Sequence, residues 1–142
     1  KQSNTPHYGR MNMFFYDPKG KKTLPYYDTF PLVIPIERYP DGFLGINFHY
    51  LPMALRLRLL DRIVDFSNNT KFDETTVIDA DYPKLKNLKE IKPTLKRYLA
   101  GRVKTRFRRV DADEFTVAAL LPIARWKKGT QEQVYRDSRR MI

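Results

Sequence analysis

The alternation of apolar and polar residues predicts a β-hairpin in the first third of the chain. From position 43 onward one face carries Phe43, Gly45, Asn47 and His49, and the other carries Leu44, Ile46, Phe48 and Tyr50. A period of two is typical of a strand. The apolar segment Phe30–Arg38 precedes it, with prolines that remove ladder donors and therefore predict an edge or bulged strand. Because Tyr39-Pro40-Asp41-Gly42 has the composition of a tight turn, we expect Leu32–Ile36 to pair with Leu44–Phe48.

Helical spacing appears after this hairpin. Pro52 suits a first helical position, and Leu55, Leu59, Leu60, Ile63 and Phe66 then recur at three to four residues. Ser67-Asn68-Asn69 ends this helix. We expect four shorter helices: Pro83–Leu88 capped by Asp81, Pro93–Ala100, a helix that starts from a capping box of Asp111 and Glu114 and runs to Leu121, and Thr130–Arg139. Met13–Tyr16 and Thr75–Ile78 are further strand candidates.

The segment Arg102–Val110 fits two structures. In a strand, Arg102, Lys104, Arg106 and Arg108 share one face, while Val103, Thr105 and Phe107 share the other. A helix is the alternative, because Leu95, Leu99, Val103 and Phe107 lie four residues apart. We favour the strand, since a helix would place Arg102, Arg106 and Arg109 within the apolar stripe.

Together these elements predict an α+β fold: a small antiparallel sheet with an N-terminal hairpin, packed by three to four short helices, with extended basic termini. The length of 142 residues fits a single domain. We expect an extended arm at residues 1–12, the domain at 13–126 and a basic tail at 127–142. The chain begins at Lys1 and not at a methionine, which leaves its true N-terminus open.

Charge is the strongest functional signal in the sequence. The net charge is +11, yet the stretch between Ile91 and Val110 contains eight basic residues and no acidic one. Such a block repels itself unless something negative lies against it. We therefore expect a polyanion or an acidic neighbouring protein as the partner.

In strand form, four cations of this block would lie about 6.6 Å apart along one side, close to the spacing of phosphates on a DNA strand. Four neutralised phosphates would give a salt slope of about −3.6 on duplex DNA. The predicted binding residues are Arg97, Arg102, Lys104, Arg106, Arg108 and Arg109. A solvated strand edge, kept from pairing by its charges, is the competing interpretation. No motif that reads a DNA sequence is present.

Aromatic side chains form a second cluster, interleaved with cations in the first thirty residues. Aromatic rings beside cations can stack on single-stranded bases, although packing or protein–protein contact is the more common use of such residues. The predicted interface residues are Tyr8, Phe14, Phe15, Tyr16, Tyr26 and Tyr27.

Catalytic residues are scarce. Cysteine is absent, no glycine-rich phosphate loop or nucleophile elbow occurs, and the only histidines are His7 and His49. We expect His49 to be a packed or capping residue. Asp79, Asp81, Glu90 and Lys92 loosely resemble the carboxylate–lysine set of magnesium-dependent nucleases, but Pro93 follows directly and no strand supports the set. We predict no catalytic residue, no metal site and no cofactor, and the longest apolar run, Val117–Ala124, is too short to span a membrane.

Several motifs resemble those of small virion-type proteins of T4-like contractile-tailed bacteriophages, which often carry the label of DNA end protector. They are Phe15-Tyr16-Asp17-Pro18, Leu24-Pro25-Tyr26-Tyr27-Asp28, Phe30-Pro31-Leu32, Asp41-Gly42-Phe43-Leu44-Gly45, His49-Tyr50-Leu51-Pro52, Lys96-Arg97-Tyr98-Leu99 and Asp111-Ala112-Asp113-Glu114. The resemblance covers most of the chain, which is nevertheless short for the end protector of T4 itself. It implies a particle component near packaged DNA or at the neck, tail or baseplate, and no active site.

We therefore expect a non-enzymatic virion assembly protein, assembled in the host cytoplasm, whose partners are other virion proteins and DNA bound without sequence preference. Three alternatives stay open. In the first, the chain is a purely structural baseplate or tail subunit whose arm (Lys1–Tyr16) and tail (Lys127–Ile142) wrap neighbours. The others are a magnesium-dependent nuclease and a ribonucleoprotein subunit.

Overall fold

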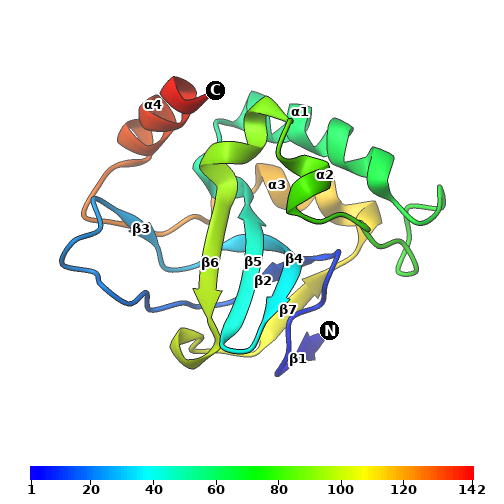
Figure 1. Cartoon of the computed structure of the whole chain (residues 1–142), viewed down its shortest axis with the longest axis horizontal. Helices are drawn as coiled ribbons and strands as arrows, with labels where there is room; N and C mark the ends of the chain where they lie inside the picture. Colours follow the sequence, from blue (N-terminus) through cyan, green and yellow to red (C-terminus); the bar gives the residue numbers. More distant parts are fainter.

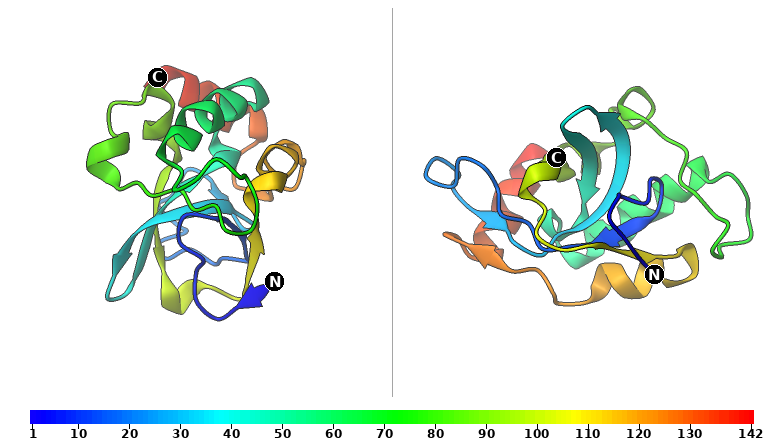
Figure 2. Two further views of the ribbon diagram at one scale, coloured as in Figure 1. Left: turned by 90° about the vertical axis from the view of Figure 1, so that its right-hand side faces the viewer. Right: turned by 90° about the horizontal axis from the view of Figure 1, so that it is seen from below.

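A six-stranded antiparallel sheet forms the centre of the molecule, and the helices lie together on one side of it (Figures 1 and 2). The computed structural model describes residues 1–142. The strands are arranged in the order β1-β7-β2-β4-β5-β6, with bounds β1 Gln2–Ser3, β2 Met11–Met13, β4 Leu32–Tyr39, β5 Gly42–Asn47, β6 Leu95–Leu99 and β7 Phe107–Val110. A separate two-stranded ribbon joins β3 (Tyr27–Asp28) to β8 (Trp126–Lys127).

The helices are mostly short. Four are α-helices: α1 Met53–Ile63, α2 Tyr82–Leu85, α3 Phe115–Leu120 and α4 Gln131–Met141. Five are 3-10 turns: η1 Phe48–Tyr50, η2 Val64–Phe66, η3 Lys89–Thr94, η4 Ala100–Arg102 and η5 Ala112–Glu114. No helix combines the length and the apolar character needed to cross a bilayer.

Each face of the sheet carries its own apolar core. The larger core joins Ile34 and Ile46 of the sheet to Leu59 and Ile63 of α1 and Phe115 of α3. The smaller core is aromatic: Phe14, Tyr16, Val33, Phe43, Tyr98 and Phe107 pack on the opposite face. Alternation along β5 explains the split, because Phe43 points into the aromatic core whereas Ile46 and, just beyond the strand, Phe48 point into the larger one.

The predicted α+β class and the predicted hairpin are confirmed. β4 pairs with β5 from Val33↔Asn47 to Tyr39↔Gly42, and the turn lies at Pro40–Asp41. The register shifts between Pro35 and Glu37, so the proline is accommodated by a bulge, as expected. The helix after Pro52, the Asp81 cap of α2 and the helix after Thr130 are also confirmed.

Four local predictions are wrong. Residues 95–99 form strand β6 and not a helix, because five of their residues pair with β5 and Tyr98 enters the aromatic core. Thr75–Ile78 is not a strand and makes only the isolated bridge Ser67↔Ile78. Only Phe107–Val110 of the predicted strand 102–110 is regular. The capping box fails because the Asp111 carboxylate is taken by Arg109 at 2.8 Å and gives no cap bond.

Both ends of the chain pack on the domain. β1 pairs with β7 at the edge of the sheet. The C-terminal segment is helical and not extended: Val134 is fully buried, and the Ser138 hydroxyl donates to the backbone oxygen of Tyr50 at 2.6 Å. In the isolated chain, both ends therefore lie against the domain.

Candidate nucleic-acid interface

The six cations predicted to bind a polyanion fall into two groups. Three are paired within the chain: Arg97 with Asp41, Arg102 with Asp17 at 3.1 Å and Arg109 with Asp111. The other three, Lys104, Arg106 and Arg108, are exposed and have no carboxylate partner. The predicted row of four cations therefore contains only three without a carboxylate partner, because Arg102 is paired with Asp17.

Residues 102–105 are held beside residues 15–17 by irregular antiparallel pairing. The amide of Asp17 donates to the Arg102 oxygen at 3.0 Å, and the amide of Lys104 donates to the Phe15 oxygen at 2.8 Å. The Thr105 hydroxyl accepts from the Phe15 amide at 2.9 Å. The predicted alternation holds only in part: Phe107 is buried and Val103 half-buried, but Thr105 is exposed together with Lys104, Arg106 and Arg108.

Two aromatic rings lie next to these cations. The rings of Phe15 and Phe30 are 4.4 Å apart and both are half-buried. The Arg125 guanidinium lies 5.2 Å from the centre of the Phe15 ring and 5.9 Å from that of Phe30. A hollow of about 360 Å³ is lined by Phe15, Phe30, Arg106 and Arg108 together with Gln2, Met13, Phe14 and Thr105. We call Phe15, Phe30, Arg106, Arg108 and Arg125 the basic groove.

Other predicted aromatic residues have different roles. Phe14 and Tyr16 are buried in the aromatic core and offer no surface to a partner. Tyr8 lies beneath the Arg38 guanidinium, 3.8 Å from its ring centre. Tyr26 donates its hydroxyl to Asp137 of α4 at 3.0 Å; burial, together with this bond, raises the pKa of Tyr26 to about 12. Tyr27 is half-buried in β3.

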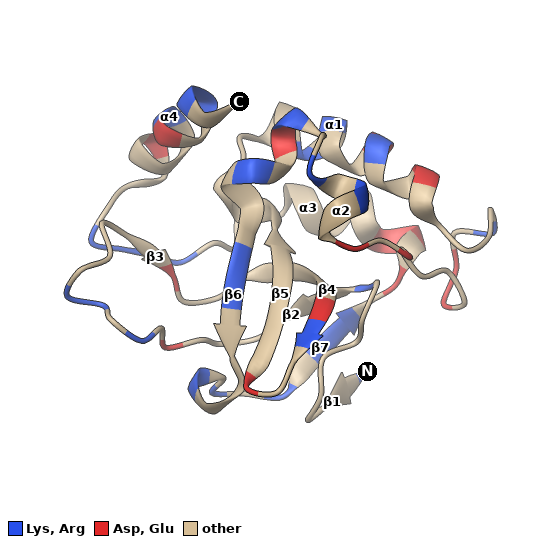
Figure 3. Cartoon of the chain, in the orientation of Figure 1, with Lys and Arg blue, Asp and Glu red and all other residues tan.

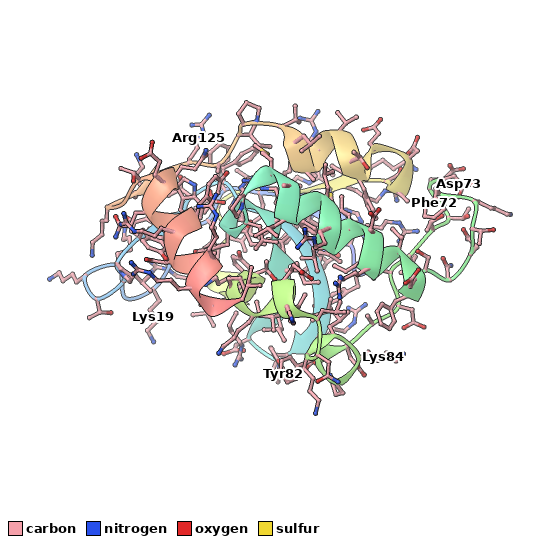
Figure 4. The ribbon with its side chains drawn as sticks, turned by 90° about the horizontal axis from the view of Figure 1, so that it is seen from above. Lys19, Phe72, Asp73, Tyr82, Lys84 and Arg125 are labelled. Carbon is pink, nitrogen blue, oxygen red and sulfur yellow. The ribbon has the colours of Figure 1, made fainter.

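A basic loop at residues 19–22 joins segments that are distant in sequence. Asp17 forms ion pairs with both Lys21, at 2.7 Å, and Arg102. The ammonium of Lys128 donates to the backbone oxygens of Lys21 and Lys22. Lys19 and Arg125 consequently lie at the same end of the molecule as α4, on opposite edges, whereas Phe72 and Asp73 lie at the far end (Figure 4).

The charges are unevenly distributed over the molecule. Asp and Glu are frequent in the loop after α1 and around η5, while Lys and Arg dominate β6, β7 and the loop at residues 19–22; α1 itself carries three arginines and one aspartate (Figure 3). Nine of the sixteen carboxylates belong to α1, to the segment between α1 and α2, or to the segment from Asp111 to Glu114: Asp61, Asp65, Asp73, Glu74, Asp79, Asp81, Asp111, Asp113 and Glu114.

The carboxylates of the nuclease alternative are not brought together. Asp81 caps α2 by accepting from the Lys84 amide, and Asp79 is exposed. Glu90 is buried, with Arg62 at 3.4 Å. No group of three or more His, Asp or Glu side chains in the chain has a geometry that could hold a metal ion.

His49 is fully buried, and its Nδ1 lies 2.6 Å from Oδ2 of Asp28. Burial alone would raise the pKa of Asp28, but the bond with His49 and the amides of Arg125 and Phe30 outweigh it and lower that pKa. His49 also donates its backbone amide to the Asn47 side chain. This pair joins β3 to the end of β5, in agreement with the packed role expected for His49.

The sequence reveals the acid-free block but not the groove as a unit. Phe30 falls in the predicted strand segment Phe30–Arg38 and Arg125 just before the predicted basic tail at residues 127–142, and neither was predicted to be a binding residue. No local sequence pattern predicts that these residues lie together, because the groove is formed by residues near positions 15, 30, 107 and 125, which are far apart in the chain.

The fold and this surface define a small α+β protein with a cation-lined aromatic groove. The family model of the phage T4 terminal DNA protecting protein matches residues 1–139. The chain therefore belongs to this family, and the expected resemblance is confirmed. No protein of curated function and no solved structure matches it.

Proposed function

We propose that this protein binds the ends of linear duplex DNA without sequence preference and shields them from exonucleases, with no catalytic step of its own. The observation that supports this function most directly is the basic groove, in which three guanidinium groups without a carboxylate partner lie beside two adjacent aromatic rings. Membership of the terminal DNA protecting family supports DNA as the polyanion.

The two kinds of side chain have separate tasks in this proposal. Arg106, Arg108 and Arg125 contact phosphates, which gives affinity without sequence information. Phe15 and Phe30 stack on the outer face of the last base pair. That face is accessible only where a duplex ends, so stacking supplies the preference for ends over duplex interior.

The cation contribution is tested by the variant Arg106→Gln/Arg108→Gln/Arg125→Gln. Losing three phosphate contacts should reduce the magnitude of the slope of log K against log salt by about 2.7. It should also weaken binding to all duplex sequences alike. The matched control is Lys84→Gln/Lys86→Gln/Lys89→Gln, which removes three exposed cations near α2. Fluorescence anisotropy with a labelled duplex at several salt concentrations measures the affinity and the salt slope of each variant. Equal slopes for the two variants would rule out the groove as the phosphate contact.

The aromatic contribution is tested by competition between a linear duplex and a covalently closed circle of the same sequence. We expect the protein to prefer the linear form, and Phe15→Leu/Phe30→Leu to reduce this preference about tenfold while leaving the salt slope unchanged. If closed circles compete as well as linear DNA at equal mass, the protein does not recognise ends.

We place the protein in the phage particle, where it is in contact with other virion proteins. The exposed apolar side chains of Val117, Leu120 and Leu121, around the end of α3, support a protein contact in addition to DNA. A purely structural subunit is the second candidate function, and it predicts that the isolated chain binds no DNA end.

A further inference from the structure

A second cavity lies on the other side of the segment that carries the basic groove. It has a volume of about 450 Å³ and is formed between β6 and the chain from Tyr16 to Asp28. Phe15 lines the groove and Tyr16 lines this cavity, so the two are separated by one thickness of chain. Three half-buried tyrosines, Tyr26, Tyr27 and Tyr50, form part of its wall. Its volume is within the range of about 300–1,000 Å³ that is common for small-molecule sites.

Lys96 supplies a cation in the wall of this cavity. It shares a face of β6 with Tyr98, because side chains two residues apart point the same way. Its ammonium lies 4.0 Å from the centre of the Tyr50 ring and makes no ion pair or hydrogen bond within the chain. Two further cations, Lys19 and Arg97, also line the cavity and are exposed, which places them at its rim.

The two carboxylates that line the cavity are already engaged. Asp28 accepts from the Asn47 side chain and from the amides of Phe30 and Arg125, and it contacts His49. Asp41 is paired with Arg97. Lys96 is therefore a half-buried cation that has the Tyr50 ring beside it but no carboxylate counter-ion, a state that folding alone does not favour. Burial lowers the pKa of Lys96 to about 8, so the side chain still carries a proton at neutral pH.

We propose that this cavity binds the phosphorylated terminal nucleotide of a DNA strand, unpaired and turned out of the duplex, with its phosphate at Lys96 and its base among Tyr26, Tyr27 and Tyr50, so that Phe15 and Phe30 stack on the last pair that remains. The phosphate supplies the counter-ion that Lys96 lacks, and the tyrosine rings supply stacking partners that do not select a base. This inference rests on the proposed function, since it names the part of the DNA end that the protein holds. It would make the protein sensitive to the chemical state of the end.

The single tryptophan of the chain provides a direct readout. Trp126 packs against two of the three tyrosines: its ring centre lies 4.9 Å from that of Tyr50 and 6.0 Å from that of Tyr26. Filling the cavity should change its fluorescence. We expect a saturable change with thymidine 5′-monophosphate and a much weaker response to thymidine. Lys96→Met should weaken nucleotide binding at least about tenfold, and Lys96→Arg should retain part of it.

The matched control is Lys92→Met, an exposed lysine four residues away, which should bind the nucleotide like the parent chain. Thermal unfolding followed by circular dichroism verifies that each variant is folded. Nucleotide affinity that is unchanged in Lys96→Met, or lost equally in Lys92→Met, would overturn the assignment.

Duplex DNA separates this inference from the proposed function. We expect ends with a 5′-phosphate or a 3′-phosphate to bind about tenfold tighter than ends with hydroxyl groups only. Lys96→Met should abolish this difference and lower the salt slope by no more than about 0.9, against about 2.7 for the variant that lacks the three groove arginines. If all ends bind equally well, the cavity assignment fails and end binding stands. If no duplex binds, the proposed function fails. The fluorescence titration with thymidine 5′-monophosphate then decides by itself whether the cavity binds a nucleotide.

Discussion

Lys96 shows how a single residue can oppose the stability of the fold that contains it. Its pKa falls from 10.5 to about 8 on folding. Below pH 8 both the folded and the unfolded chain keep the proton, so folding bears the full penalty of a buried charge. Between pH 8 and 10.5 only the unfolded chain keeps the proton, and stability rises with pH. A residue that destabilises the free protein in this way is typical of a binding site.

Lys96→Met should therefore increase the free energy of unfolding at pH 7 by about 1–2 kcal/mol, a value reduced from the pKa difference because the lysine is partly exposed. Burial and the bond with Asp137 keep Tyr26 protonated through this range, while the lowered pKa of Asp28 keeps its carboxylate charged. Urea denaturation at pH 7 and above pH 10 measures the difference, which should shrink at the higher pH. A destabilised variant at pH 7 would contradict the account of Lys96.

At the level of secondary-structure elements, one buried arginine joins the helices to each other and to the turn beside the cavity. Arg56 of α1 is 1% exposed. Its guanidinium donates to the backbone oxygens of Leu51 at 2.7 Å and Ala119 at 2.8 Å, and to the Tyr135 hydroxyl at 2.9 Å. Burial is the main cause that lowers its pKa. These bonds connect α1 to α3 and α4, and α4 in turn holds Tyr50 through Ser138.

Arg56→Ala should lower the free energy of unfolding by about 3 kcal/mol or more, because each buried acceptor that loses its donor costs about 1–3 kcal/mol. Arg58→Ala removes an exposed cation from the same helix and should change stability by less than about 0.5 kcal/mol. Chemical denaturation of both variants provides the comparison. Equal stabilities would mean that the bonds of Arg56 do not hold the helices together.

The elements that could be predicted from the sequence are those with local signals. The hairpin β4–β5 has a turn sequence between two alternating segments, and α1 and α4 have both helical spacing and clear start signals. Strand β6 lacked such a signal: Pro93 and the spacing of Leu95 and Leu99 favour a helix locally. Five residue pairs with β5 override this preference, and they are contacts across about fifty residues of chain.

The candidate site was predictable only in part, for the same reason. Lys104, Arg106 and Arg108 were identified from the acid-free block and are exposed. The pairing of Arg102 with Asp17, the contact of Arg125 with Phe15 and the isolation of Lys96 all depend on which distant segments fold against them. Charge along a sequence therefore indicated the kind of partner, but not which cations are free to meet it.

The whole molecule combines a net charge of +11 with an uneven distribution of its carboxylates. Under the proposed function, phosphates are attracted to the groove and to the loop at residues 19–22, which would favour one orientation of the protein on DNA. A protein held in this way would cover the end of a duplex.

Protection of a linear duplex from a processive exonuclease that enters at DNA ends tests the central claim most directly. We expect the parent chain and Lys84→Gln/Lys86→Gln/Lys89→Gln to preserve full-length DNA at low salt, and this protection to disappear as salt is raised. Arg106→Gln/Arg108→Gln/Arg125→Gln should leave the DNA degraded at the rate seen without protein. Equal protection by both triple variants, or none by the parent chain, would contradict the assignment of the basic groove as the surface that covers DNA ends.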